Sequence, residues 1–394
     1  MTAVSEQIGA WLGEFTGQPK AEGWLQALRE TGFQRFAELG FPTTHHEEWR
    51  FTSVAAVARA HYRVGTAEQR LRFSPPVQKL NWSEAQAHLG KHADFDQNAF
   101  VALNTAFLGD VAILRVPAGA VLETPIEITY EFPAGNPAGA VAVHPRTLIL
   151  VGAHAQCAIV ETYKGAGEYF TNAVTEIVVD DSAVVDHYKV VLESAAACHI
   201  ATMQASLGRS ANFSSHSISL GGALVRNDAG VVLSEGTEAT LNGLYLATGT
   251  QHIDNHTVID HAKPHGTSHE LYKGILDGRA NAVFNGRIVV RKDAQKTDSK
   301  QTNKNLVLSD DAVINTKPEL QIHADDVRCT HGATIGQLDA ESVFYLQSRG
   351  IGKEQARAML TYAFAQDILD RIKVPALKES LEKALFEKFH EHDQ

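Results

Sequence analysis

Cysteine is scarce in this chain of 394 residues, which contains only three. The thiols of Cys157, Cys198 and Cys329 are too few to form a disulfide framework at this length, so a reducing compartment is expected. The segment from Met1 to Phe15 lacks the basic cluster of a signal peptide or a transit peptide. Together these absences predict a cytoplasmic protein.

Long apolar runs and an excess of positive charge are also missing. No stretch approaches the ~20 apolar residues of a membrane span, and the formal net charge is −11. An acidic chain is poorly suited to a nucleic-acid backbone or an anionic membrane, so neither is expected as a partner. There is no GxxxxGK(S/T) loop and no GxGxxG after a strand, which excludes nucleotide binding in the P-loop manner.

The hydrophobic pattern divides the chain into a helical start, a long β region and a helical end. From about Val101 to Ile335, short β-branched runs are separated by Gly, Asp and Asn. We therefore expect an N-terminal helical region at 1–95, a β core at 96–337 and a C-terminal helical region at 338–394. Pro375 is well placed to begin the last helix. Apolar residues at helical spacing indicate the flanking helices: Ile8, Trp11, Leu12, Phe15, Trp24 and Leu28 near the start, and Ala356, Met359, Leu360, Ala363, Phe364 and Ile368 near the end.

A repeat runs through the β region. A turn pattern of Gly or Asp, two arbitrary residues and Ala occurs four times at a spacing of 28 residues, beginning at Gly152, Asp180, Gly208 and Gly236. Such a period is typical of a solenoid, whose coils bury their inward faces on each other. We predict a mostly β fold, a right-handed parallel β-helix flanked by helices; sandwich hairpins would also give short strands. An apolar residue lies two positions after each Ala, which makes Cys157 a core side chain equivalent to Val185, Phe213 and Leu241.

Cys329 and His331 are the most suggestive pair in the chain. On a strand their side chains leave the same face about 7 Å apart. They could be structural, or a nucleophilic pair, although no oxyanion loop or third group is visible. They could also ligate iron or a cluster, because a thiolate and an imidazole suit such metals. A cluster typically takes about four protein ligands, so another chain would have to supply the rest.

Two other classes of protein remain open. Five histidines between His252 and His269 could form the metal site of a stand-alone β-helix enzyme, although no HExxH or paired CxxC frames them. The alternative interpretation is that these histidines are polar residues on the hydrated face of a solenoid. A secreted β-helix enzyme acting on acidic polysaccharide would share the fold, but would call for a signal peptide and a basic or calcium-assisted cleft. The five histidines are His252, His256, His261, His265 and His269.

Several ordered motifs resemble the SufB/SufD family of iron–sulfur cluster assembly proteins. The resemblance is dense from about 250 to 370, and Cys329-Thr330-His331-Gly332 is similar to the SufD branch, whereas SufB members carry Glu-His-Glu there. The N-terminal CxxC of many SufB chains is also missing. The motifs begin with Glu47-Glu48-Trp49-Arg50-Phe51-Thr52-Ser53 and continue through Glu270-Leu271-Tyr272-Lys273-Gly274, Ala282-Val283-Phe284-Asn285-Gly286-Arg287, Gln301-Thr302-Asn303-Lys304-Asn305 and Thr316-Lys317-Pro318-Glu319-Leu320.

This resemblance implies a scaffold and not an enzyme. It implies pairing with a SufB-like paralogue through the β-helix, with a homodimer as the alternative when the chain is alone, and ATP hydrolysis by a SufC-like ATPase. His331, with Cys329 beside it, would ligate iron or a transient cluster at the partner interface, and the isolated chain would hold none stably. The residues implied in docking the ATPase are Phe344, Tyr345, Leu346, Arg349, Ile351, Ala363 and Phe364.

Overall fold

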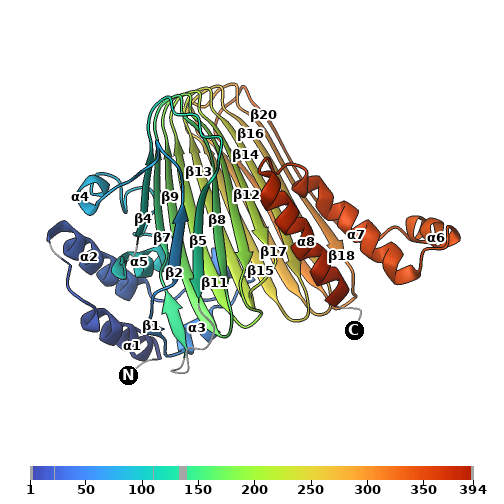
Figure 1. Cartoon of the computed structure of the whole chain (residues 1–394), viewed down its shortest axis with the longest axis horizontal. Helices are drawn as coiled ribbons and strands as arrows, with labels where there is room; N and C mark the ends of the chain where they lie inside the picture. The colour runs from blue at the N-terminus through green and yellow to red at the C-terminus, as the bar shows by residue number, and fades with distance from the viewer. Residues whose placement is uncertain (1–2, 22, 110, 133–139, 392–394) are drawn as a thin grey trace.

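The computed structural model describes residues 3–21, 23–109, 111–132 and 140–391. Its centre is a β-solenoid of about seven turns, which confirms the predicted mostly β, coiled architecture. Helices from the start of the chain lie on one side of the solenoid and helices from the end lie on the other (Figure 1). No helix within the described ranges is both long enough and apolar enough to cross a membrane.

The part of the chain before Val111 is mostly helical, with three short strands that join the sheets of the solenoid. Ala99–Ala106 is a buried helix, so the β region begins later than the predicted Val101. Asn98 caps this helix by accepting from the backbone N–H groups of Phe100 and Val101. The elements are α1 (Ala3–Gly17), α2 (Gly23–Leu39), the 3-10 helix η1 (Glu47–Trp49), α3 (Ala55–Arg59), β1 (Arg63–Val64), β2 (Glu68–Arg72), β3 (Gln78–Lys79), α4 (Trp82–Ala85) and α5 (Ala99–Ala106).

The solenoid is built from two facing sheets. In sheet A the main path runs β3, β4, β7, β9, β11, β13, β15, β17 and β19, with β1 and β6 beside it, and in sheet B it runs β2, β5, β8, β10, β12, β14, β16, β18 and β20. Strands from β7 onward pair in parallel with their sheet neighbours. The bounds are β4 (Val111–Val116), β5 (Ile126–Phe132), β6 (Val141–Val143), β7 (Arg146–Val151), β8 (Gln156–Gly165), β9 (Tyr169–Val179), β10 (Val184–Leu192), β11 (Cys198–Leu207), β12 (Asn212–Ser219), β13 (Leu224–Leu233), β14 (Glu238–Ala247), β15 (His252–His261), β16 (Thr267–Leu276), β17 (Asn281–Val290), β18 (Asp298–Val307), β19 (Val313–Ile322) and β20 (Arg328–Gly336).

The repeat identifies the coils, but its fourth copy is displaced by two residues. Phe213 pairs in register with Ala239 and not with Leu241. A positive φ angle occurs at the third residue of each of the first three turns (His154, Ser182, Ser210). In the fourth turn it occurs at the first residue, Gly236. The coil before Gly236 is therefore shorter, and packing tolerates this because the turns lie outside the sheets. Residues in one inner row are spaced by 28, 28, 26, 29, 31 and 30: Cys157, Val185, Phe213, Ala239, Ser268, Ser299 and Cys329.

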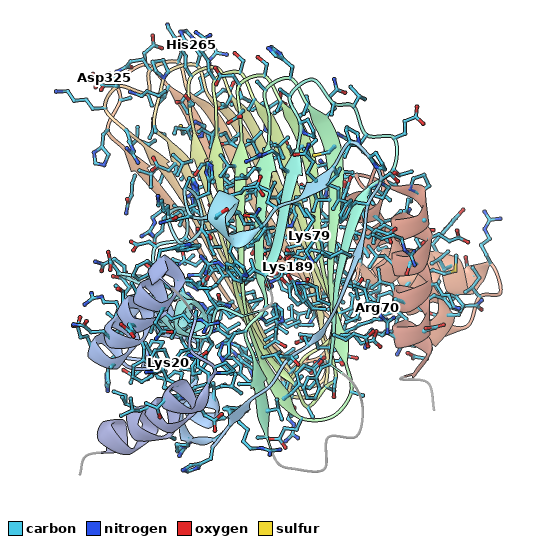
Figure 2. All side chains as sticks on the ribbon, turned by 60° about the vertical axis from the view of Figure 1, so that its left-hand side comes forward. Lys20, Arg70, Lys79, Lys189, His265 and Asp325 are labelled. Carbon is cyan, nitrogen blue, oxygen red and sulfur yellow. The ribbon has the colours of Figure 1, made fainter. Side chains whose placement is uncertain are left out.

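The core between the sheets is apolar near the start of the solenoid and along its turns, with polar side chains along its middle. Cys157 is buried in the apolar part, and burial raises the pKa of its thiol to about 12, as expected for an inert core residue. Lys189 lies among the strands in Figure 2, where burial lowers its pKa to about 8 and its ammonium donates to Asn227. Buried polar groups need such partners, so the interior is a hydrogen-bonded column as well as a hydrophobic core.

Helices cover the outer faces of both sheets. α1, α2 and α5 pack on outward residues of sheet A such as Phe170 and Ile200. The predicted final helix does begin at Pro375, and α7 and α8 pack on outward residues of sheet B such as Tyr188 and Leu244. α6 instead projects away from the sheets (Figure 1). The C-terminal helices are α6 (Ala340–Ser348), α7 (Lys353–Leu369) and α8 (Pro375–Glu391).

Candidate functional site

The solenoid is open at its C-terminal end. β19 and β20 are the last strands of their sheets, and within the described residues neither has a strand on its outer side. Three apolar side chains are exposed there: Val313, Ile322 and Ile335, the last 54% exposed. A shallow depression between Val313 and Ile335 marks the gap between the two sheets. An edge with unpaired backbone groups and exposed apolar residues is a template for another chain.

Cys329 and His331 lie on the inner face of this last coil. Their register partners on β18, Ser299 and Gln301, are buried inside the solenoid, and register partners share a face. Cys329 is half-buried and packs against an apolar cluster that includes Ile288, whereas His331 is exposed. The two side chains therefore face the open mouth of the solenoid.

A hydrogen-bonded row continues inward from Cys329. Behind it, the hydroxyl groups of Ser299 and Ser268 are 2.7 Å apart, and Ser268 is 2.9 Å from Nε2 of His261. Burial, followed by the nearby charge of Asp298, raises the pKa of the Cys329 thiol. The thiol is thus protonated at neutral pH, and metal binding would have to displace that proton.

A second inward row begins at His331. Gln301 is its neighbour on β18, and Glu270 follows on β16. Nε2 of Gln301 donates to Glu270 at 2.7 Å, and both side chains are buried. The two rows bring the Cys329 thiol, the His331 imidazole and the polar side chains behind them to the same opening.

The ligands at this opening are too few for a complete metal site within one chain. Across the described residues, no group of three or more His, Cys, Asp or Glu side chains is placed to hold a metal ion. A thiol and an imidazole nonetheless suit iron and iron–sulfur clusters. The two side chains alone are fewer than the about four protein ligands that a cluster typically takes.

The five histidines of the alternative metal site are not brought together. His252 and His256 lie on the outer face of sheet A, and His261 points into the interior. His265 is in a turn with φ of 62°, and His269 is exposed on the outer face of sheet B. They lie on a strand, in a turn and on a second strand, and their side chains face different directions.

The residues implied in docking an ATPase fall into two groups. On α6, Phe344 and Tyr345 are 71% and 57% exposed, and Arg349 stacks over the Tyr345 ring at 5.2 Å. Phe364 instead faces the solenoid, where the ammonium of Lys273 lies 4.5 Å from its ring centre. Leu346 and Ile351 are half-buried and Ala363 is exposed.

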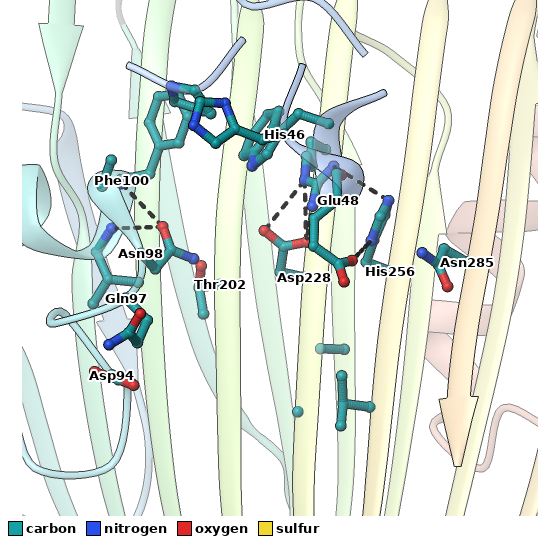
Figure 3. A pocket seen from close by; sticks show the side chains of 18 of the residues that line it. His46, Glu48, Asp94, Gln97, Asn98, Phe100, Thr202, Asp228, His256 and Asn285 are labelled. Carbon is teal, nitrogen blue, oxygen red and sulfur yellow. Dashed lines mark hydrogen bonds and ion pairs between the residues drawn. The ribbon is translucent and has the colours of Figure 1, made fainter. Parts of the chain in front are cut away.

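Sequence reasoning missed a cleft of about 760 Å³ between the N-terminal segment and the outer face of sheet A. Figure 3 shows Glu48 and His256 pointing toward each other there, with Asp228 beside them. Arg226 is buried and forms ion pairs with Asp228 at 2.9 Å and Asp254 at 2.8 Å. The opposite charges are paired with one another. The residues of this cleft therefore hold the N-terminal segment against sheet A. A spacing of 28 between Arg226 and Asp254, equal to the repeat, is the sequence signal that could have revealed it.

Comparison with known proteins places the chain in a family. Residues 134–364 match the family model described as SUF system FeS cluster assembly, SufBD core domain. An iron–sulfur cluster assembly SufBD family protein of Synechocystis sp. is 33% identical over 98% of this chain and 95% of its own length. The iron–sulfur cluster assembly protein SufD of Escherichia coli is 29% identical over 92% and 91%, and protein ABCI7, chloroplastic, of Arabidopsis thaliana is 33% identical over 90% and 84%. The chain thus belongs to the SufBD family of iron–sulfur cluster assembly proteins and is SufD-like.

Proposed function

We propose that this chain is a non-ATPase scaffold that contributes one side of an iron–sulfur assembly site at an interface between two β-solenoids. The observation that carries the proposal is the placement of His331 and Cys329 on the inner face of a coil that is left open. A side chain facing a closed solenoid would be sealed from any partner, whereas these two face the place where a partner would lie.

A SufB-like paralogue is the proposed occupant of the open end. The outer edges of β19 and β20 offer unpaired backbone groups, and Val313, Ile322 and Ile335 offer apolar surface. A second solenoid that adds its own last strands would cover both at once. The homodimer of this chain is the competing arrangement when the paralogue is absent.

Iron or a nascent cluster would be the cargo of that interface. This chain would supply His331, with Cys329 as a second ligand once its thiol loses a proton, and the paralogue would supply the remaining ligands. Because the described residues include no three-ligand group, the isolated chain is expected to retain little iron.

An ATPase of the SufC type is proposed to bind α6 and the neighbouring part of α7. α6 contains no buried residue, and its two aromatic side chains project into solvent. Asp339 caps α6 by accepting from the backbone N–H of Ser342 at 3.0 Å, and only Gln337 and Leu338 separate this cap from the end of β20. A displacement of α6 would therefore act directly on the strand that carries His331.

The test is purification of this chain together with the SufB-type and SufC-type chains of its source, followed by iron and sulfide analysis. His331→Ala is compared with wild type and with His323→Ala, which removes an exposed imidazole just after β19 at the same end of the solenoid. Complexes that form normally but lose iron only with His331→Ala support the proposal. Failure of the wild-type chains to associate, or equal iron in both variants, contradicts it. Cys329→Ser in the same assay determines whether the thiol is also a ligand.

A further inference from the structure

Gln301 lies directly between the proposed iron ligand and a buried carboxyl group. Glu270, Gln301 and His331 are consecutive register partners on β16, β18 and β20, so their side chains stack along the inner face. Adjacent strands are about 4.8 Å apart, which places the Gln301 amide within reach of the His331 ring.

A hydrogen bond to Glu270, on the side away from His331, fixes the orientation of the Gln301 amide. Its Nε2 donates to Oε2 of Glu270 at 2.7 Å, and its side chain is 1% exposed. Gly286 on the facing sheet leaves room for it, since a Cβ at that position would lie 2.3 Å from Nε2 of Gln301. With its nitrogen committed to Glu270, the amide presents Oε1 to its other neighbours.

That oxygen has no hydrogen-bond partner although it is buried. A buried acceptor left unpaired is energetically unfavourable, so such an atom calls for an explanation. On the side of Gln301 away from Glu270, its register partner is His331, on the last strand of the sheet.

An imidazole that binds a metal has a matching requirement. It must be neutral, one nitrogen faces the metal, and the other N–H is usually donated to a carboxylate, a carbonyl or water, which fixes the tautomer. An amide oxygen held in place by a buried carboxyl group can meet that need.

We propose that Gln301 is the positioning residue of His331: its Oε1 accepts the N–H of one ring nitrogen and turns the other nitrogen toward the partner interface. This inference rests on the proposed function for its iron, but the hydrogen bond would form within this chain once the exposed His331 ring turns toward Oε1, which has no partner in the structure. Glu270 acts one step further in by holding the amide.

The hydrogen bond is tested first, in the isolated chain, by ¹⁵N NMR of histidine-labelled protein, with His331 assigned by its loss in His331→Ala. Gln301→Leu removes the acceptor and should shift the His331 ring signals toward the tautomer mixture of a free imidazole. Gln301→Glu keeps an acceptor oxygen, with one proton shared between the 301 and 270 carboxyl groups, and should preserve the wild-type tautomer.

Asn303→Leu is the matched control. Asn303 is a buried amide on the same strand and inner face, donating to the backbone of Tyr272, but its register partner is Ala333 and not His331. It should lower stability about as much as Gln301→Leu while leaving the His331 signals unchanged. Unchanged His331 signals in Gln301→Leu, or equal changes in both variants, overturn the proposal.

Iron binding by the three-chain complex is the second measurement. Gln301→Leu should weaken iron binding about 10- to 100-fold, Gln301→Glu should restore most of it, and Asn303→Leu should leave it unchanged. Loss of iron with Asn303→Leu as well would make the role of Gln301 structural and overturn the positioning role. If the NMR result holds but His331→Ala retains iron, the hydrogen bond stands and the proposed iron-binding function fails.

Discussion

Arg226 lies over the indole ring of Trp49, with its guanidinium carbon 3.8 Å from the ring centre. The same guanidinium donates to the backbone carbonyl of Glu48 at 2.7 Å and to Asp254 at 2.8 Å. Thr52 adds a hydrogen bond to Asp254 at 2.6 Å. One buried cation thus joins the N-terminal segment to β13 and β15, and the Glu-Glu-Trp-Arg-Phe-Thr motif can be understood as the segment that it fastens.

Removing that cation should be strongly destabilising. Arg226→Met leaves Asp254 buried without its main partner, which costs about 3–5 kcal/mol of the free energy of unfolding. Arg50→Met, which removes an exposed guanidinium near Phe51, should change it by less than about 0.5 kcal/mol. Urea unfolding measures both. The double variant Arg226→Met with Asp254→Asn should lose less than the sum of the single variants, and additive losses would show that the two groups are not coupled.

His256 should make stability depend on pH in the alkaline range. Burial and Arg226 would lower its pKa, but Asp254 and Glu48 outweigh them and raise it to about 9. This stabilisation is complete below the unfolded-state pKa near 6.5 and is lost as pH rises through about 9, because the folded protein then gives up its extra proton.

Melting temperature measured from pH 6 to pH 10 tests this dependence. His256→Gln should flatten the decline between pH 6.5 and 9. His252→Gln is the control, since burial lowers the pKa of His252 and so moves its titration away from the alkaline range. A decline of equal slope in His256→Gln and wild type would rule out His256 as its source.

Glu270 should act on stability with a different pH window. Burial raises its pKa to about 7 against the opposing hydrogen bond from Gln301. Between pH 4.5 and 7 the unfolded chain ionises this carboxyl group while the folded chain keeps it protonated, so folding stability falls as pH rises.

Glu270→Gln removes this penalty and keeps an oxygen acceptor for Gln301. It should raise the free energy of unfolding at pH 8 by roughly 3 kcal/mol and have little effect at pH 4. Glu235→Gln, at an exposed turn position, should have no effect at either pH. A Glu270→Gln variant no more stable than wild type at pH 8 would mean that the carboxyl group is ionised and solvated in the fold.

The architecture was predictable because each coil of a solenoid repeats the same pattern of strands and turns. Turn residues and inward apolar residues recur with nearly constant spacing, and this identified the coils and the core role of Cys157, while apolar residues at helical spacing identified the flanking helices. The displacement at Gly236 was not predictable, since a coil can lose two residues in its turn without changing the pairing of its strands. The buried helix Ala99–Ala106 was also missed, because a short apolar run has no clear period.

The sequence predicted which two residues form the candidate site but not where in the fold they lie. The sequence indicates that Cys329 and His331 share a face, yet only the register with Ser299 and Gln301 reveals that this face is the inner one. Whether a coil is the last of its sheet depends on the whole topology. The support from Gln301 and Glu270 is equally hidden, because the residues are about thirty apart and become neighbours only when three coils stack.

Aromatic residues of α6 should control binding of the ATPase subunit without affecting the fold. Phe344 and Tyr345 are exposed on a helix with no buried residue, so replacing either by Ala should change the melting temperature little. Exposed aromatic side chains often dominate protein interfaces, and the loss of one typically costs about 2 kcal/mol or more of binding free energy. Each variant should therefore weaken association with the SufC-type ATPase at least roughly 30-fold.

Phe386→Ala is the matched control for this prediction, because Phe386 on α8 is 58% exposed and lies on a helix that packs on sheet B. Calorimetric titration of each variant with the ATPase gives the affinities. Weakened binding by Phe344→Ala and Tyr345→Ala but not by Phe386→Ala would place the interface on α6, next to the strand of His331. The reverse pattern would place it on α8, where a bound ATPase could not act on β20 through its two-residue connection, and would contradict the proposed coupling between the ATPase and the open end.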